Sequence, residues 1–218
     1  MRVTVSFLTL VKSAKETLKL INATDADYLH IDLMDGKFVE PKVQQVSELK
    51  SLLPIVEKPL DVHIMGVNPT KYLPFFASFN SVYFVFHLEA VKDVSSTIEE
   101  IKMTGLKPGI ALKKDTDIED VKPYLKDIDQ ILLMSCVAGY GGTNLWEEEE
   151  FVSSMTKKIS DLKAYREENN LNYIISIDGG INNETVVICK EAGIDMVIGG
   201  SYVTKGDDYQ ERINNLRI

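Results

Sequence analysis

The sequence predicts a parallel (β/α)8 barrel, the TIM-barrel fold. Eight short runs rich in β-branched and aromatic residues alternate with longer amphipathic segments along the chain. Polar residues also gather where these runs end, the edge of a barrel that carries chemistry. The first turn, SFLTLVKS (6–13), lacks the GxGxxG pattern of an open dinucleotide-binding sheet. We expect a single domain spanning residues 1–218.

The first half of the chain supplies four strand candidates and three helix candidates. The strand candidates have the length and composition of buried strands, and Gly, Pro or Asn stands at many boundaries. The predicted strands are VTVSF (3–7), DYLHIDLM (27–34), PLDVHIM (59–65) and SVYFVFH (81–87), and the predicted helices are 12–23, 43–52 and 92–104.

The second half repeats this alternation. Its helix candidates are a long segment that opens with the acidic run Glu147 to Glu150 and a short tail near the C-terminus. Acidic residues suit the positive end of a helix dipole, so we interpret the run as a solvated first turn. The predicted strands are KPGIAL (107–112), QILLMS (130–135), YIISID (173–178) and DMVIGG (195–200), and the predicted helices are 147–169 and 208–216.

Composition excludes several classes of protein. The net charge is -9, so the chain lacks the basic surface that nucleic acid or an anionic membrane requires. The two cysteines, Cys136 and Cys189, have no CxxC spacing and are interpreted as small buried residues. No secretory signal and no membrane-length apolar segment is evident, so we expect a cytoplasmic protein.

A histidine and carboxylate pattern predicts a metal site. Residues two apart in a strand share a face, so His30 lies beside Asp32. His63 and Asp178 end other predicted strands, and all four would meet at the barrel mouth. Such nitrogen and oxygen ligands suit zinc, iron, manganese or cobalt rather than calcium. A lone histidine is more often a core residue, but all three histidines, including His87, lie near strand ends.

Glycines mark a second candidate region. AGYGG (138–142), DGG (178–180) and IGGS (198–201) follow the last three predicted strands. Barrels commonly bind phosphate there with bare backbone N–H groups, which would let an acidic protein hold an anion. The alternative is that these glycines serve only tight turns. Met34, Met65 and Met134 would lie beside the metal site, either as core residues or as an apolar wall over a planar intermediate.

The linked motifs HIDLMDG, PLDVHIM, FHLEA, ILLMS, GYGG, IDGGI and GGS resemble the ribulose-phosphate 3-epimerase family from Ser6 to Ser201. The resemblance implies a barrel of the ribulose-phosphate-binding type with one divalent metal ion. It also implies an isomerase of carbohydrate metabolism, as in the pentose phosphate pathway, that epimerises a sugar phosphate at C3. A homo-oligomer, either a dimer or a hexamer, is expected on the same ground.

The resemblance also assigns roles by matching position. It makes His30, Asp32, His63 and Asp178 metal ligands, and Asp32 and Asp178 the pair that transfers protons through an enediolate. Met34, Met65 and Met134 match a methionine cap. The substrate-binding positions that match are Ser6, His63, Gly139, Tyr140, Gly141, Gly142, Gly179, Gly180, Gly200 and Ser201.

The sequence departs from the family pattern in loops around the substrate. Lys37 and Glu40-Pro41 replace a His and Pro-Asn, Val137-Ala138 replaces Asn-Pro, Thr143 replaces a Gln, and Val5 stands where Pro is common. None of these changes a predicted ligand, so they put the identity of the sugar in doubt rather than the metal chemistry.

Two substrates fit the resemblance. D-Ribulose 5-phosphate is the first choice, and a hexulose phosphate such as D-allulose 6-phosphate is the second. A metal-free decarboxylase of the phosphate-binding barrels is disfavoured, because DVHIM (61–65) replaces the Asp-x-Lys-x-x-Asp array. A catalytically silent sugar-phosphate sensor is a further alternative, although a sensor would not need both carboxylates.

Overall fold

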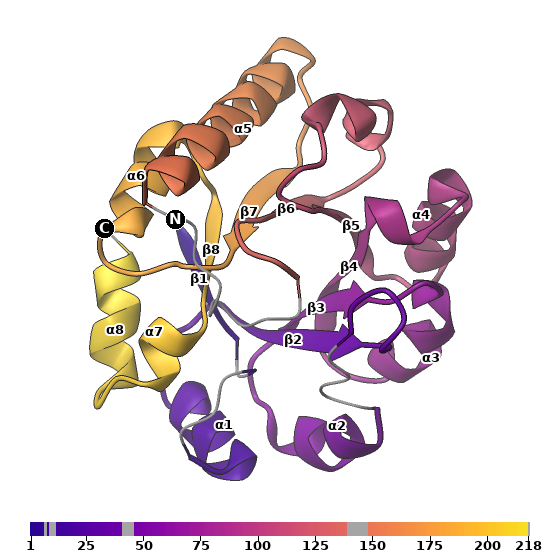
Figure 1. The fold of residues 1–218 in the computed structure, drawn as a ribbon. Helices are drawn as coiled ribbons and strands as arrows, with labels where there is room; N and C mark the ends of the chain where they lie inside the picture. Colours follow the sequence, from indigo (N-terminus) through magenta and orange to yellow (C-terminus); the bar gives the residue numbers. More distant parts are fainter. Residues whose placement is uncertain (7, 9–11, 41–45, 139–147, 218) are drawn as a thin grey trace.

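The chain forms a closed barrel of eight parallel strands with helices around it (Figure 1). The computed structural model describes residues 1–6, 8, 12–40, 46–138 and 148–217, with residues 148–153 described by backbone alone. Each strand pairs with its sequence neighbours, and β1 closes the barrel against β8. The predicted (β/α)8 fold is therefore confirmed.

All eight predicted strands are present, with boundaries that differ by at most one residue at each end. The last strand is shortened most, because it is one residue shorter at each end than predicted. The strands are β1 (Arg2–Ser6), β2 (Tyr28–Met34), β3 (Leu60–Met65), β4 (Ser81–His87), β5 (Lys107–Leu112), β6 (Gln130–Met134), β7 (Ile174–Asp178) and β8 (Met196–Gly199).

The predicted helices are also present, and capping residues explain several of their starts. The side chains of Ser13, Asp93 and Asp208 each accept a backbone N–H from the first turn of their helix. The α-helices are α1 (Ala14–Asn22), α2 (Val46–Leu52), α3 (Leu73–Phe76), α4 (Val94–Met103), α5 (Glu148–Glu168), α6 (Thr185–Ala192), α7 (Ser201–Thr204) and α8 (Tyr209–Leu216).

The connection from β5 to β6 departs from a regular β/α unit. It contains two 3₁₀ helices, η4 (Ile118–Asp120) and η5 (Lys122–Tyr124), in place of an α-helix. Pro123 has no amide hydrogen to donate, which disfavours a continuous α-helix there. Three more 3₁₀ helices, η1 (Leu53–Ile55), η2 (Pro69–Tyr72) and η3 (Leu88–Ala90), lie in earlier connections.

Side-chain alternation separates an outer apolar layer from the barrel interior. On β2, Leu29, Ile31 and Leu33 belong to the large core shared with the helices. The intervening residues, His30 and Asp32, are buried polar groups on the other face. The same alternation on β3 to β7 confines polar side chains to the interior.

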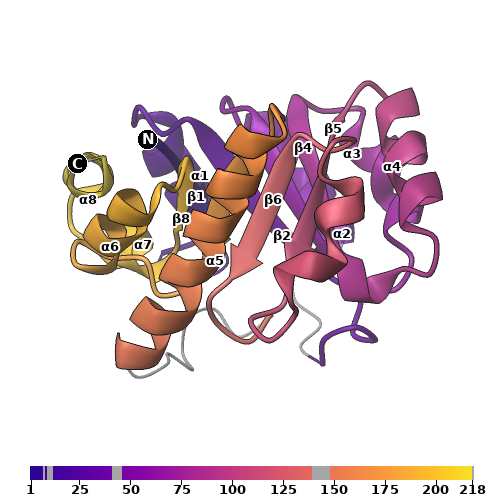
Figure 2. The same cartoon turned by 90° about the horizontal axis from the view of Figure 1, so that it is seen from above.

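Parallel register aligns this interior across neighbouring strands. Asp32 of β2 lies opposite His63 of β3, and Met134 of β6 lies opposite Asp178 of β7. In Figure 2 the arrowhead of β6 and the first turn of α5 lie toward the same edge of the barrel. The carboxyl ends of the strands thus form one face. Within the described residues, no helix combines the length and apolar character needed to cross a membrane.

Helix α6 offers a matched test of burial. Val186 is fully buried, whereas 40% of Val187 is exposed. Both Val→Ala changes gain the same helix propensity, so their difference isolates packing. We expect Val186→Ala to unfold with a free energy about 1–3 kcal/mol lower than Val187→Ala in urea titrations. Equal stabilities would contradict the position of α6 against the core.

Candidate active site and metal centre

Four side chains from three strands form a compact cluster at the barrel mouth. One potential ligand atom from each lies within 4.8 Å of the others. His30, Asp32 and His63 are buried, and Asp178 is partly exposed. The structure therefore brings together all four predicted metal ligands, His30 and Asp32 on β2, His63 on β3 and Asp178 on β7.

The contacts of His30 suit a metal ligand. Its Nδ1 atom lies 2.8 Å from Asp61 Oδ2, an arrangement that orients the ring as carboxylates do for metal-bound histidines. Its buried Nε2 atom has no hydrogen-bond partner among the described residues. That atom lies 3.2 Å from Asp32 Oδ1 without the geometry of a hydrogen bond. An unpartnered nitrogen beside two carboxylates fits a divalent cation.

His63 presents its other ring nitrogen to the cluster. Its Nδ1 atom lies 3.1 Å from Asp32 Oδ1. Its Nε2 atom lies 3.0 Å from Nε2 of His87. Because His87 occupies the Nε2 side, Nδ1 is the atom of His63 that is available to a metal ion.

The two carboxyl groups of the cluster have pKa values shifted in opposite directions. Burial and the negative charge of Asp32 raise the pKa of Asp178 to about 6. Burial alone would raise the pKa of Asp32, but the imidazoles of His30 and His63 lower it below its usual range. Such divergence is typical of carboxyl pairs that perform acid and base chemistry.

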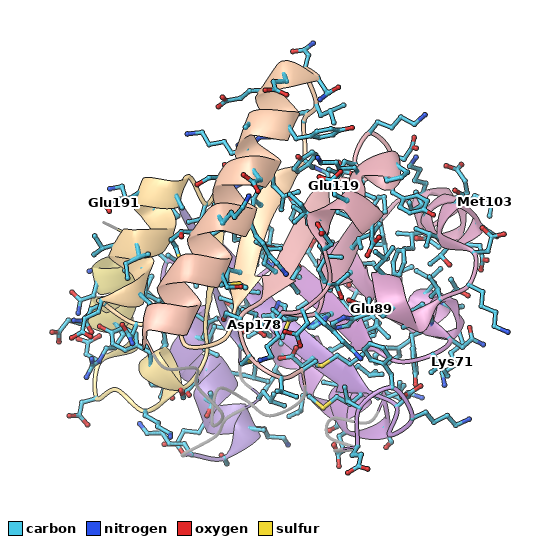
Figure 3. All side chains as sticks on the ribbon, turned by 45° about the horizontal axis from the view of Figure 1, so that its top comes forward. Lys71, Glu89, Met103, Glu119, Asp178 and Glu191 are labelled. Atoms are coloured by element: carbon cyan, nitrogen blue, oxygen red, sulfur yellow. The ribbon has the colours of Figure 1, made fainter. Side chains whose placement is uncertain are left out.

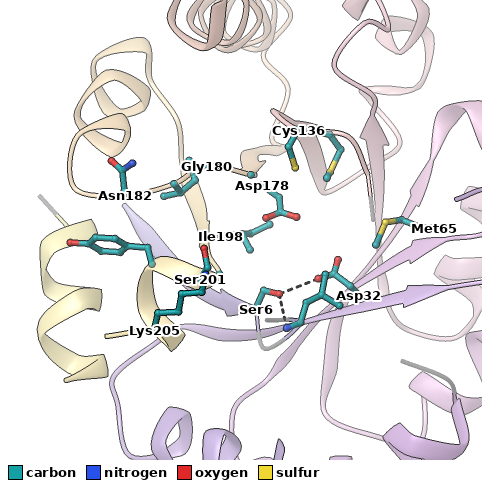
Figure 4. Close-up of a pocket in the computed structure, with 16 residues that line it drawn as sticks. Ser6, Asp32, Met65, Cys136, Asp178, Gly180, Asn182, Ile198, Ser201 and Lys205 are labelled. Atoms are coloured by element: carbon teal, nitrogen blue, oxygen red, sulfur yellow. Dashed lines mark hydrogen bonds between the residues drawn. The ribbon is translucent and has the colours of Figure 1, made fainter. Parts of the chain in front are cut away.

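A cavity of about 310 Å³ adjoins the cluster. Asp32 and Asp178 both line it, and Ser6 donates a 3.1 Å hydrogen bond from Oγ to Asp32 Oδ2 (Figure 4). Met65 and Met134 line it as well. Met34 lies in the same buried apolar cluster as these two methionines. Met65 and Met134 thus lie at the cavity with the carboxylates, and the methionine cap stays a prediction.

Residues of two glycine-rich turns also line the cavity. Gly179, Gly180, Gly200 and Ser201 line it, whereas Gly139, Tyr140, Gly141 and Gly142 lie outside the described residues. Gly179 has φ +111, and an added Cβ would lie 2.6 Å from Ser135 Oγ. This position therefore favours glycine, and its backbone packs closely against Ser135 and Cys136.

Sequence reasoning did not select several residues that line the cavity. These include Asn182, Tyr202 and Lys205, together with Cys136, which is buried as predicted. In Figure 4, Asn182 and Lys205 lie on the side of the cavity away from Met65. Their positions just beyond the DGG and GGS turns were the available signal, because residues after barrel strands commonly reach the site.

A closed parallel barrel with this histidine and aspartate cluster defines a (β/α)8 protein with a site suited to a divalent metal. A family model described as the ribulose-phosphate 3 epimerase family matches residues 2–204. The chain belongs to this family, which places it among the isomerases that epimerise carbohydrates.

Named relatives agree with the family match. The chain is 32% identical over 201 residues to ribulose-phosphate 3-epimerase of Bacillus subtilis (strain 168), covering 92% of this chain and 90% of that protein. It is 33% identical over 203 residues to ribulose-phosphate 3-epimerase of Methanocaldococcus jannaschii, covering 93% of this chain and 83% of the relative.

Solved structures with low sequence identity share the fold. The 3-hexulose-6-phosphate synthase from Salmonella typhimurium aligns with a TM-score of 0.65 at 16% identity, over 99% of this chain and 96% of that chain. Tryptophan synthase subunit alpha from Campylobacter jejuni aligns with a TM-score of 0.61 at 16% identity, over 99% and 94%. These similarities extend to the barrel alone.

Metal binding should release protons. In the metal-free site, burial opposes the charged form of His30, but Asp32 and Asp61 raise its pKa well above the usual value. Ligation needs the unprotonated imidazole, so we expect proton release on Zn²⁺ binding at pH 7. Release should increase as the pH falls toward about 6, where Asp178 also carries a proton.

Calorimetric titrations in buffers of different ionisation enthalpy would measure this release. Addition of Ca²⁺ is the control, because calcium prefers an all-oxygen ligand set. Zinc binding with no proton release at pH 7 would contradict the charged state assigned to His30.

Proposed function

We propose that this protein is a metal-dependent 3-epimerase that interconverts D-ribulose 5-phosphate and D-xylulose 5-phosphate. The observation that carries the proposal is the pair Asp32 and Asp178, which line one cavity and belong to one metal-type cluster. The names of the family and of its relatives support the choice of substrate. His30, Asp32, His63 and Asp178 would hold the cation, which would be zinc, iron, manganese or cobalt.

Epimerisation next to a carbonyl requires a proton to leave one face of C3 and another to arrive on the opposite face. Asp32 and Asp178 come from β2 and β7, on different sides of the barrel mouth. One carboxylate would remove the C3 proton while the other, protonated, would deliver a proton to the opposite face. Exchange of these roles supports reaction in both directions.

The other side chains would position this pair. Ser6 holds Asp32 through its hydroxyl, and Met65 and Met134 would exclude water from the planar enediolate. When bound, a divalent cation would act as a Lewis acid and stabilise negative charge on the substrate oxygens. Asp61 would keep His30 oriented through the 2.8 Å contact.

The phosphate group would lie at the far side of the cavity. Gly180, Gly200 and Ser201 border that side, and Lys205 supplies a positive charge there. Open space surrounds the position of a Cβ at Gly200, so a phosphate oxygen could approach its backbone. Distance from the carboxylates would reduce repulsion between the phosphate and the ionised Asp32.

Loss of either carboxylate should abolish most turnover. We expect Asp32→Asn and Asp178→Asn each to lower turnover about 10²- to 10⁴-fold, because an amide cannot transfer the C3 proton. Proton NMR in D₂O would follow loss of the C3 proton from D-ribulose 5-phosphate, with metal-stripped and metal-reconstituted protein. D-Allulose 6-phosphate, measured in parallel, would test the hexulose alternative.

Asp161→Asn is a suitable control, because Asp161 pairs with Lys157 on the solvent-facing side of α5. Substantial activity in either active-site variant would contradict the assignment of Asp32 and Asp178 as the two proton-transfer groups. Faster proton exchange with D-allulose 6-phosphate than with D-ribulose 5-phosphate would instead assign the hexulose phosphate as the substrate. No exchange with either sugar in folded, metal-loaded protein would favour the catalytically silent alternative.

Lys205 should affect substrate binding more than chemistry. We expect Lys205→Ala to raise KM about tenfold or more while kcat changes little, because a charge-assisted contact to phosphate contributes about 1.5–3 kcal/mol. Initial rates with D-ribulose 5-phosphate would measure both constants. Lys190→Ala, an exposed change on α6, is the matched control. A fall in kcat at constant KM would contradict a role at the phosphate.

A further inference from the structure

The third histidine of the chain, His87, continues the metal-type cluster away from the cavity. It is fully buried at the end of β4. Its Nε2 atom lies 3.0 Å from Nε2 of His63, and its Nδ1 atom lies 3.2 Å from Glu89 Oε2. The three side chains thus form a continuous chain from the cluster to a carboxylate of η3.

We propose that Glu89, acting through His87, is a positioning residue that sets the tautomer of His63 for metal binding. The inference rests on the proposed function, because it assigns His63 as a ligand. Neither Glu89 nor His87 is placed in contact with the sugar. Figure 3 shows Glu89 and Asp178 near the barrel mouth on separate elements.

The argument follows the direction of hydrogen bonds. A metal ion at Nδ1 of His63 requires the proton of that neutral imidazole to be on Nε2. This Nε2–H must donate to Nε2 of His87, which must then be the unprotonated nitrogen of His87. The remaining proton of His87 is therefore on Nδ1, and it points toward Glu89. A carboxylate, which only accepts, completes this order.

Glu89 is itself fixed in an accepting arrangement. The backbone N–H of Lys113 donates to Glu89 Oε1 at 2.8 Å, and the hydroxyl of Thr116 donates to the same oxygen. Burial would raise the pKa of Glu89, but hydrogen bonds from His87, Thr116 and Lys113 lower it to about 2. The ionised side chain therefore keeps Oε2 for His87.

Packing holds the intermediate ring in place. The Phe38 ring lies 4.8 Å from the His87 ring, and the Lys113 ammonium lies 4.2 Å from the centre of the Phe38 ring. Phe38 follows β2 in the segment where the sequence departs from the family pattern. The orientation of His87 therefore depends on loops after β2 and β5, beyond the metal ligands themselves.

Glu89→Gln tests this order with almost no change in shape. The amide oxygen can keep the Lys113 and Thr116 contacts, but then the amide NH₂ faces the Nδ1–H of His87. Rotation of the amide restores an acceptor for His87 but turns NH₂ toward the Lys113 N–H. When His63 binds a metal, both orientations of the amide therefore place two hydrogen-bond donors against each other. This repulsion disfavours the metal-bound state.

Zinc affinity is the first measurement. Chelator competition with metal-stripped protein should show about 10- to 100-fold weaker Zn²⁺ binding for Glu89→Gln than for wild type. Glu99→Gln is the matched control, because Glu99 pairs with Lys102 on the exposed face of α4. Circular dichroism of the metal-free proteins would check that both variants are folded. Unchanged zinc affinity in folded Glu89→Gln overturns the proposal.

Imidazole nitrogen NMR provides a second measurement that needs no variant. The chain has three histidines, so long-range ¹H–¹⁵N spectra of zinc-loaded wild type contain three rings. The ring with neither nitrogen bound to zinc is that of His87. We expect its proton on Nδ1, and a proton on Nε2 overturns the proposal even if Glu89→Gln does not fold.

These outcomes separate the inference from the proposed epimerase. Zinc binding with the expected tautomer, but without epimerisation of either sugar phosphate, would support the positioning role of Glu89 and contradict the proposed function. Wild-type protein that binds no divalent cation would contradict both the epimerase function and the role of Glu89. Normal epimerisation with an unchanged zinc affinity in Glu89→Gln would contradict the role of Glu89 alone.

Discussion

The two-residue period of the β-strand is the constraint on which the rest of this structure depends. In a closed parallel barrel, every second side chain faces the helices and every other one faces the interior. The outward residues of β2 and β3 are Leu, Ile and Val, and they join one core with the helices. Because this outer core stabilises the barrel, the inward positions can carry the buried polar residues His30, Asp32 and His63. A shift of one residue in either strand would reverse both assignments.

Burial of these charged groups makes their pairing compulsory. An isolated carboxylate in such an interior would lose much of its hydration free energy, so each must have a partner. Asp61 contacts His30, and Ser6 and His63 contact Asp32. Asp178 makes no such side-chain hydrogen bond among the described residues, and its pKa is raised to about 6. Asp178, the less compensated of the two carboxyl groups that line the cavity, thus lies where a cation or substrate would stabilise its charge.

The sequence predicted the strands well because periodicity and composition are local properties. It also predicted the four-residue cluster, since chemistry at strand ends follows from the barrel once the strands are known. The 3₁₀ connection after β5 was harder, because a short polar segment with Pro123 has little helical period. Lys205 and the link from Glu89 to His63 depend on contacts between separate loops and strands, which no local pattern contains. Glu89 stood two residues from a predicted strand end, yet its role requires the backbone of Lys113.

The charges that line the cavity favour one orientation of the proposed substrate. Asp32 and Asp178 line the cavity from separate strands, and Lys205, the cationic side chain among the described residues that line it, lies on the side away from Met65 (Figure 4). A protein with a net charge of -9 repels an anion over most of its surface, so in the proposed function this local contrast would determine where the phosphate group binds. A phosphate group beside Lys205 and the bare glycine backbone would leave the carbon chain to extend toward the two carboxylates. C3 can then lie between them, whereas the reversed orientation would bring a dianion against ionised Asp32. In the proposed function, the same charges that make the cluster costly to bury would therefore restrict the substrate to the productive orientation.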